Sequence, residues 1–325
     1  MKYVLLAAGA VLLSACQHSD DSLNQVISQK YVHKYGFDVT ENEWEERSQE
    51  GQVITLLANG VKVIQSYENG ILHGPTTNTF PHSSVIEKIM MYDAGTLLKE
   101  TQCDHSGIPI KEEIFEFDDR TIITSWDDKG VPLSIEEYEH NLLMEGKYYT
   151  PEHVLESTVE AGFGERIKRD RTGTLLSRDM IENGCSSQRI SYHPNGQVHT
   201  ISHYHDEQLH GEQLKYTASG KPLMKLNWNH GVLDGLKTVY RNGTKIAEIP
   251  YDHGSKQGLE YHYDDLGHLT AEIEWKADKK HGASKFHTED TTEVEWFFKG
   301  KTVSAHKFEL LDTREKLLAD LGAMQ

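Results

Sequence analysis

Two series of glycines recur in this sequence every 23 or 24 residues, and this period constrains the fold more than any other feature. The first series is Gly196, Gly220, Gly243 and Gly267, and the second is Gly211, Gly235, Gly258 and Gly282. Each repeat unit therefore contains two turns. Because one short unit cannot bury its own apolar face, such units stack on their neighbours and share a continuous core. The period predicts an array of repeats, not one closed globule.

Side chains between the turns follow the same spacing. An aromatic residue comes eight positions after each first-series glycine: Tyr204, Trp228, Tyr251 and Trp275. Leu226, Ile249 and Ile273 precede the last three of these by two positions. Alternation with a period of two indicates strands with one buried face. Each unit is therefore predicted to be a pair of antiparallel strands, and the aromatic row either forms the core or offers partly exposed anchors to a partner.

A second aromatic row and several turns complete the unit. Tyr216, Tyr240 and Tyr263 come five residues after the second-series glycines, and they are the candidate partner-binding residues. Asn-Gly pairs at 69–70, 195–196 and 242–243 are typical of two-residue hairpin turns in which both residues have positive φ. The predicted fold class is mainly β, an elongated array of antiparallel hairpins.

The motifs Tyr192-His-Pro-Asn-Gly196, Tyr240-Arg-Asn-Gly243 and His253-Gly-Ser-Lys-Gln-Gly258 resemble the MORN repeat, and more closely its bacterial variant in YwqK-family proteins. The resemblance implies a long, twisted antiparallel meander. The pattern is regular from about 161 to 308. Between 51 and 160 it is degenerate, with Tyr92-Asp-Ala-Gly95 and Trp126-Asp-Asp-Lys-Gly130 as altered copies, so irregular hairpins or bulges are expected there.

Both ends of the array are predicted to differ from its middle, because an open stack leaves an unpaired edge. Residues 309–325 are predicted to form a capping helix that begins at a capping box, Asp312-Thr-Arg-Glu315. Leu317, Leu318 and Leu321 would form its apolar stripe. Residues 25–50 are predicted to hold a small helix or strand that caps the first repeat.

The N-terminus carries an export signal. Lys2 precedes an apolar stretch from Tyr3 to Leu13, and Leu13-Ser-Ala-Cys16 closes it, which is the order of a secretory signal peptide over residues 1–15. These four residues also resemble the bacterial lipobox, which implies lipidation of Cys16 and a tether over 16–24. Gln17 in place of an aspartate favours the outer membrane, on its periplasmic or surface side.

Charge limits the class of partner. The formal net charge is −18, and the apolar fraction is only 37%. Nucleic acids and anionic lipid headgroups are bound through clustered lysine and arginine, so an acidic chain argues against both. The expected partners are the membrane, through the lipid anchor, and an unknown protein or envelope glycan.

Histidines are numerous and invite a metal interpretation. The densest group is His193, His199, His203, His205 and His210. His203 and His205 share one strand face, a spacing that could ligate zinc with a third ligand from a neighbouring strand. They also flank Tyr204, so alternation places them on the solvent face. We therefore expect surface histidines, with neither a metal nor a cofactor.

Catalytic patterns are missing from the sequence. It has no Gly-x-Ser-x-Gly elbow, no cysteine-centred catalytic motif and no phosphate-binding Gly-x-x-x-x-Gly-Lys-Ser/Thr. Carboxylate pairs such as Asp127-Asp128 and Asp264-Asp265 are predicted to be solvated turn residues and not catalytic acids or bases. Cys103 and Cys185 are 82 positions apart, about seven strands, so they are predicted not to form a disulfide.

Three functions compete at this stage. The first is a non-catalytic scaffold that binds a protein or an envelope component at the outer membrane. The second is an exported antitoxin or immunity-like protein, because YwqK-like proteins are often labelled antitoxins. The third is an enzyme, for which the sequence leaves no stretch long and pattern-free enough to hold a catalytic domain.

Overall fold

The computed structural model describes residues 25–47 and 49–323. The predicted leader, Cys16 and the tether over 16–24 lie outside the described residues. The chain divides into two compact units between Glu116 and Phe117, and each is described separately below. Within the described part, neither helix combines the length and hydropathy that a membrane span requires.

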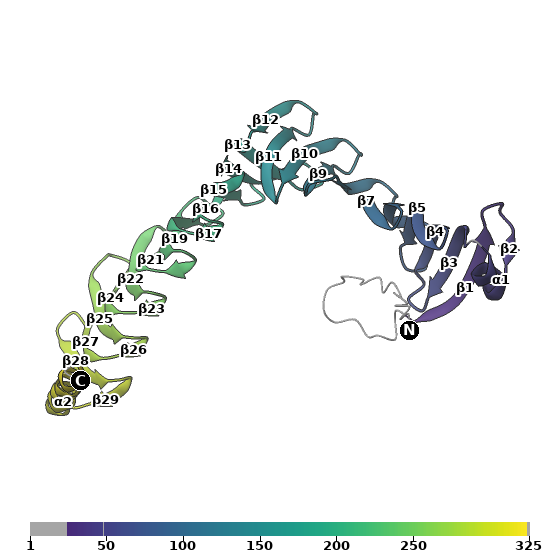
Figure 1. Ribbon diagram of the computed structural model, residues 1–325. Helices are drawn as coiled ribbons and strands as arrows, with labels where there is room; N and C mark the ends of the chain where they lie inside the picture. Colours follow the sequence, from purple (N-terminus) through teal and green to yellow (C-terminus); the bar gives the residue numbers. More distant parts are fainter. Residues whose placement is uncertain (1–24, 48, 324–325) are drawn as a thin grey trace. The chain divides into compact units, whose positions relative to one another are not determined.

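The N-terminal unit is an antiparallel meander in which β3 pairs with β1, and each strand from β4 onward pairs with the strand before it, as Figure 1 shows in purple and blue. β2 pairs with the other edge of β1. Its elements are β1 (Val26–His33), β2 (Asp38–Val39), α1 (Glu41–Glu46), β3 (Gly51–Leu57), β4 (Lys62–Glu68), β5 (Ile71–Thr79), β6 (Ile86–Asp93), β7 (Thr96–Cys103) and β8 (Pro109–Phe115).

Helix α1 begins at a capping box that the sequence analysis did not single out. The Thr40 hydroxyl accepts from the Glu43 backbone N–H, and the Glu43 carboxylate accepts from the Thr40 backbone N–H. Trp44 is buried, with its ring 5.7 Å from that of Tyr31 and 6.2 Å from that of Tyr67. The helix therefore packs against the first strands through one aromatic cluster.

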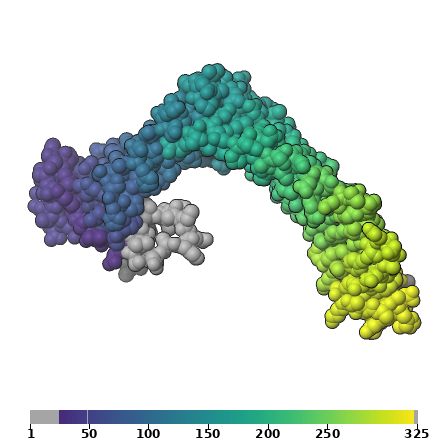
Figure 2. Space-filling model, turned by 180° about the vertical axis from the view of Figure 1, so that it is seen from behind, coloured from purple at the N-terminus to yellow at the C-terminus, as the bar shows by residue number. Residues whose placement is uncertain are grey.

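The C-terminal unit is an antiparallel meander from β9 to β29, coloured from teal to yellow in Figure 2. Its strands are β9 (Arg120–Trp126), β10 (Pro132–Glu139), β11 (Leu142–Tyr149), β12 (Leu155–Glu160), β13 (Phe163–Arg169), β14 (Leu175–Glu182), β15 (Cys185–Tyr192), β16 (Val198–His205), β17 (Gln208–Leu209), β18 (Gly211–Tyr216), β19 (Pro222–Asn229), β20 (Val232–Leu233), β21 (Gly235–Arg241), β22 (Thr244–Asp252), β23 (Ser255–Lys256), β24 (Gly258–Tyr263), β25 (Leu269–Lys276), β26 (Lys279–Lys280), β27 (Gly282–His287), β28 (Thr292–Phe298) and β29 (Lys301–Val303). The predicted fold class, an array of antiparallel hairpins with a C-terminal helix, is confirmed.

Two kinds of turn alternate along the array. One is a two-residue turn with positive φ at both positions, as at Asn69-Gly70 and Asn242-Gly243, where the sequence predicted it. The other is a longer loop such as Asp264–His268, in which one Asp264 carboxylate oxygen accepts from the backbone N–H of Leu266 and of His268. Asn195-Gly196 was predicted as the first kind and belongs to the second, because only Gly196 has positive φ.

Glycines of the second series sit directly opposite aromatic residues on the next strand. The register pairs Gly211 with Trp228, Gly235 with Tyr251, and Gly258 with Trp275. A glycine leaves room for the ring to lie across its strand. The aromatic side chains are half-buried, whereas Leu226 and Ile249, two positions earlier, are buried. The core therefore lies mainly on the aliphatic row, and each aromatic ring closes over it in part.

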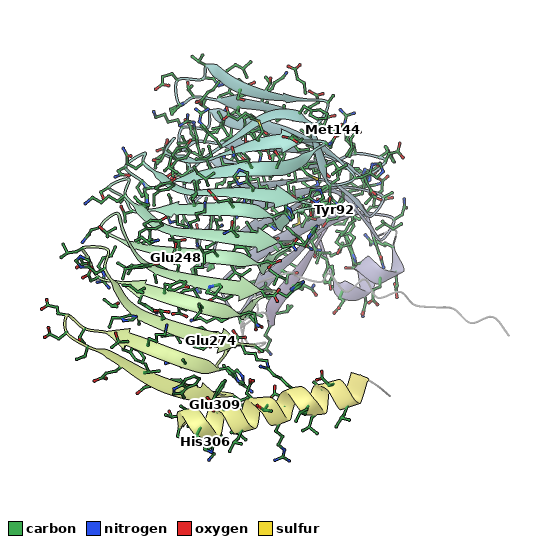
Figure 3. All side chains as sticks on the ribbon, turned by 90° about the vertical axis from the view of Figure 1, so that its left-hand side faces the viewer. Tyr92, Met144, Glu248, Glu274, His306 and Glu309 are labelled. Carbon is green, nitrogen blue, oxygen red and sulfur yellow. The ribbon has the colours of Figure 1, made fainter. Side chains whose placement is uncertain are left out.

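Helix α2 (Ala305–Ala323) differs from the predicted helix in its start and in the face it buries. It begins after Ser304, whose hydroxyl accepts from the Lys307 backbone N–H, so the predicted start at residue 309 and capping box at Asp312 are wrong. The predicted stripe is wrong too, because Leu317 and Leu318 are both 59% exposed. Instead Phe308 contacts Trp296, with ring centroids 5.1 Å apart, and α2 lies beside the last strands (Figure 3).

Candidate binding pocket in the C-terminal unit

A buried ion triad on three adjacent strands defines the candidate site. Strand register places Arg166 of β13 opposite Asp179 of β14, and Asp179 opposite Arg189 of β15. Arg166 donates to Asp179 Oδ2 from Nε at 3.2 Å and from Nη2 at 2.7 Å. Arg189 donates from Nε to Oδ1 at 3.0 Å and from Nη2 to Oδ2 at 2.9 Å. Charges therefore alternate directly across the sheet.

The three side chains of the triad are buried to different degrees, and their burial affects their pKa values. The Asp179 side chain is completely buried, that of Arg166 is 12% exposed and that of Arg189 is 37% exposed. Burial alone would raise the pKa of Asp179, but hydrogen bonds from Arg189 and Arg166 outweigh it and hold that pKa below its ordinary value. Burial opposes the charge on Arg166, and the hydrogen bond and charge of Asp179 more than restore it, so the pKa of Arg166 is raised.

Two tyrosines extend the network on the β10 and β11 side. The hydroxyls of Tyr138 and Tyr148 donate to the two oxygens of Glu136, at 2.8 and 3.0 Å. Arg166 Nη1 lies 3.5 Å from the Tyr138 hydroxyl, which links this pair to the triad. Burial, then the charge of Glu136, raises the pKa of Tyr138 to about 12 and raises that of Tyr148 further. Both phenols therefore remain protonated over the physiological range.

A hollow of 250 Å³ opens over the triad. It is lined by Tyr138, Asn141, Arg166, Ile181, Gly184, Cys185, Ser186, Arg189, Tyr204 and Glu207. The guanidinium carbon of Arg189 lies 5.6 Å from the ring centre of Tyr204. Beside it, burial and the charges of Glu207 and Asp206 raise the pKa of the Cys185 thiol, so that thiol stays protonated. The hollow offers guanidinium, phenol and hydroxyl groups for polar recognition, and we call it the arginine–tyrosine pocket.

The predicted site residues lie on other strands. Tyr216, Tyr240 and Tyr263 are half-buried near the ends of β18, β21 and β24. Tyr263 is engaged within its own sheet, because its hydroxyl donates to Glu248 at 2.8 Å and Lys245 Nζ lies 4.6 Å from its ring centre. None of the three lines the arginine–tyrosine pocket.

The sequence analysis missed Arg166, Asp179 and Arg189. The two intervals between them, 13 and 10 residues, differ, so no period marks them. Only the register of the two hairpins shows that they face one another. Tyr204, by contrast, was singled out as a repeat aromatic, and it closes one side of the pocket.

The histidine group separates into residues with different roles. His203 is not a plain surface histidine, because its Nδ1 bonds the Glu212 carbonyl at 2.8 Å and its Nε2 bonds the Gln188 amide at 2.9 Å. His193 bonds the Tyr216 carbonyl through Nε2 at 3.0 Å. His205 is exposed, as predicted, with its side chain 63% accessible. The proposed zinc pair of His203 and His205 is therefore divided between a structural residue and an exposed one.

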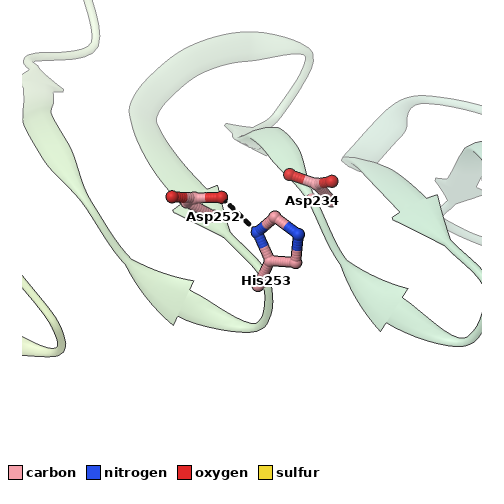
Figure 4. A group of neighbouring side chains, drawn as sticks. All are labelled: Asp234, Asp252 and His253. Atoms are coloured by element: carbon pink, nitrogen blue, oxygen red, sulfur yellow. Dashed lines mark hydrogen bonds and ion pairs between the residues drawn. The ribbon is translucent and has the colours of Figure 1, made fainter.

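One mixed carboxylate and imidazole group has ligand atoms close together. Asp234, Asp252 and His253 each place one such atom within 4.8 Å of the others (Figure 4). His253 Nδ1 bonds Asp252 Oδ1 at 2.5 Å, and Asn229 donates to Asp234 at 3.3 Å. The hydrogen bond and charge of Asp252, together with the charge of Asp234, raise the pKa of His253. The imidazole of His253 is therefore already engaged with Asp252 in this arrangement.

Comparison with known proteins supports the repeat assignment over part of the chain. The MORN repeat variant matches residues 188–206 and 209–230, which span the β15–β16 and β18–β19 hairpins. The chain thus contains MORN-variant repeats in this segment, and Arg189 and Tyr204 of the pocket lie in the first of them. Comparison with curated proteins finds no match.

Among solved structures, a porin-like protein from Bacteroides uniformis ATCC 8492 is 12% identical to this chain. The comparison covers 85% of this chain and 91% of that one, with a TM-score of 0.14. A TM-score this low carries no argument about fold or function.

Proposed function

We propose that this chain is a lipid-anchored, non-catalytic scaffold of the bacterial outer membrane, held through Cys16, whose C-terminal unit binds a partner protein at the arginine–tyrosine pocket. The observation that carries the proposal is the pocket itself. Arginine and tyrosine are the residue types most enriched among binding hot spots, and here two of each converge on one hollow. The sequence supplies the anchor, through Leu13-Ser-Ala-Cys16.

The pocket is built for rigid recognition. Asp179 fixes both guanidinium groups, which lowers the entropy lost when a partner binds. Arg189 uses only Nε and Nη2 for Asp179, so its remaining edge and the Tyr204 ring face the hollow. A carboxylate side chain on the partner fits this donor set.

The same groups favour binding over catalysis. The pKa of Tyr138 is raised first by burial and then by the charge of Glu136, and the pKa values of Arg166 and Asp179 are shifted by their bonds to each other and to Arg189. Catalytic acids and bases instead need pKa values near the working pH. The thiol of Cys185 stays protonated and is a poor nucleophile.

Photo-crosslinking in intact cells tests the proposal. A photoreactive residue at Asn141 or Glu207, both exposed at the pocket, should capture one protein, and a photoreactive residue at exposed Glu289 in the β27–β28 loop is the control. A further photoreactive residue at Tyr240 tests the predicted tyrosine row. Capture that depends on the pocket position and is lost in Cys16→Ser supports an anchored scaffold.

An exported antitoxin or immunity-like protein is the alternative. If the captured protein is a single toxin, and capture persists in Cys16→Ser, this alternative replaces the scaffold proposal. Equal capture from Asn141 and Glu289 would show that the pocket is not the docking site.

A further inference from the structure

The regular repeats share a bulge at the residue before each second-series glycine. There the backbone N–H donates to a carbonyl of the preceding strand: His210 to His203 at 2.9 Å, Asp234 to Asn227 at 3.0 Å, Gln257 to Pro250 at 3.1 Å, and His281 to Glu274 at 2.9 Å. The bulge re-aims this residue's side chain toward the two-residue turn of the next hairpin. We call it the bulge residue.

At two of these four positions, the bulge side chain caps that next turn. Gln257 Oε1 accepts from the Ala277 backbone N–H at 3.0 Å, and His281 Nδ1 accepts from the Lys299 backbone N–H at 3.4 Å. Equivalent caps occur outside the regular repeats, where His73 Nδ1 accepts from the Ala94 backbone N–H at 3.4 Å. The ordinary role of this side chain is therefore to satisfy one turn N–H.

His210 departs from that role. Its Nδ1 is buried without a hydrogen-bond partner, which carries a desolvation cost. Its ring faces two other imidazoles, with ring centres 4.8 Å away for His230 of the next turn and 5.7 Å away for His205 of the preceding turn. The rings of His205 and His230 are 5.8 Å apart. We call these residues the three-histidine cluster.

The spacing of this cluster matches a metal site. With Zn–N bonds of about 2.0–2.1 Å, ring centres lie about 3.2 Å from zinc and about 5 Å from one another in tetrahedral geometry. The three ring-centre separations, 4.8, 5.7 and 5.8 Å, lie near that value. The ring nitrogens as placed are not all within 4.8 Å of one another, since among the described residues only Asp234, Asp252 and His253 meet that criterion. Rotation of the exposed His205 and His230 rings about their side-chain bonds would then aim their nitrogens inward, with little backbone movement.

Neighbouring groups also select the coordinating nitrogens. Asp206 lies 3.2 Å from His205 Nδ1, and the Asn229 side-chain oxygen lies 2.8 Å from His230 Nδ1. Such partners hold the proton on Nδ1 and leave Nε2 for a metal, the arrangement common in zinc sites. The unpartnered Nδ1 of His210 would supply the third donor.

We propose that His205, His210 and His230 bind one divalent transition-metal ion of the zinc class, with the fourth position open to water. The equivalent junction one repeat later does not provide the same donors. There Asp234 and His253 replace His210 and His230, and His253 Nδ1 is already bonded to Asp252 Oδ1 at 2.5 Å. The two junctions thus offer a matched comparison within one molecule, and Figure 4 shows the side chains of the second one.

Calorimetric titration of the EDTA-treated full chain with zinc chloride tests the proposal. We expect one ion per chain, and affinity lowered by more than about tenfold in His230→Ala and in His205→Ala. His253→Ala, which removes the equivalent exposed turn histidine, should leave affinity unchanged. Far-UV circular dichroism checks that each variant is folded, and the exposed positions of His205 and His230 avoid a core substitution.

Two results would overturn the proposal. One is the lack of saturable zinc binding by the wild-type chain. The other is zinc binding that survives both His205→Ala and His230→Ala, including binding that is lost only in His253→Ala, which would move the site to the neighbouring junction.

Discussion

Replacing Asp179 with asparagine is the sharpest test of how the arginine–tyrosine pocket is held. The change keeps the shape of the side chain and removes the only carboxylate between Arg166 and Arg189, whose four hydrogen bonds to it are between 2.7 and 3.2 Å long. Two guanidinium groups would then face a neutral amide at a completely buried position. Breaking a buried ion pair by removing one partner costs about 3–5 kcal/mol.

Hydrogen–deuterium exchange of β13, β14 and β15 measures this cost locally. A loss of about 3–5 kcal/mol corresponds to a fall of two to three orders of magnitude or more in amide protection, since each 1.4 kcal/mol is about tenfold. The control is Glu165→Gln on the same strand, whose carboxylate pairs with Arg178 at 2.9 Å and is 36% exposed. That variant should lose less than about 1 kcal/mol. Equal protection in Asp179→Asn and Glu165→Gln would refute the claim that the triad holds these strands together.

Three further outcomes follow from the structure. The pKa of Asp179 is held below its ordinary value of 3.8, so the stability that its charge contributes is complete above pH 3.8 and is lost as the pH falls through the lower pKa of the folded state. The urea concentration at the midpoint of unfolding should therefore drop in strong acid. Asp179→Asn should make that drop smaller. Gly164→Ala should destabilise more than Gly267→Ala in thermal unfolding; both glycines have positive φ, but only at Gly164 would a Cβ meet a backbone oxygen, at 2.2 Å. Phe308→Ala should lower the free energy of unfolding by about 1–3 kcal/mol and change tryptophan fluorescence, because Phe308 contacts Trp296. Replacing the exposed Leu318 with alanine should change that free energy by no more than about 0.5 kcal/mol. The reverse order would show that the predicted leucine stripe is the packed face.

The helix shows why local pattern misplaced an element. Asp312 and Glu315 have capping-box spacing, yet both lie inside α2 and bind groups of the last repeats and of the helix itself. Glu315 pairs with Lys276 and Lys299, and Asp312 pairs with Lys316. Glu315 is thus held by tertiary ion pairs and Asp312 by a pair within the helix, so their spacing carried no information about where the helix starts.

The sequence by itself determined the repeat period, the strand pairs and most of the turns. These features depend on residues a few positions apart, because glycines set the turns and alternation sets the buried face.

Tertiary structure decided which side chains meet across strands. At the bulge before Gly211 the register changes, because Tyr204 pairs with Leu209 whereas Ile201 pairs with Leu214, and the sequence pattern did not mark that change in advance. Register brought Arg166 and Arg189 to Asp179, and the bulge at His210 brought its imidazole to His230 of the next repeat. Both the pocket and the proposed metal site therefore arise from contacts between hairpins, where the spacing along the chain is irregular and only the folded register sets the distance.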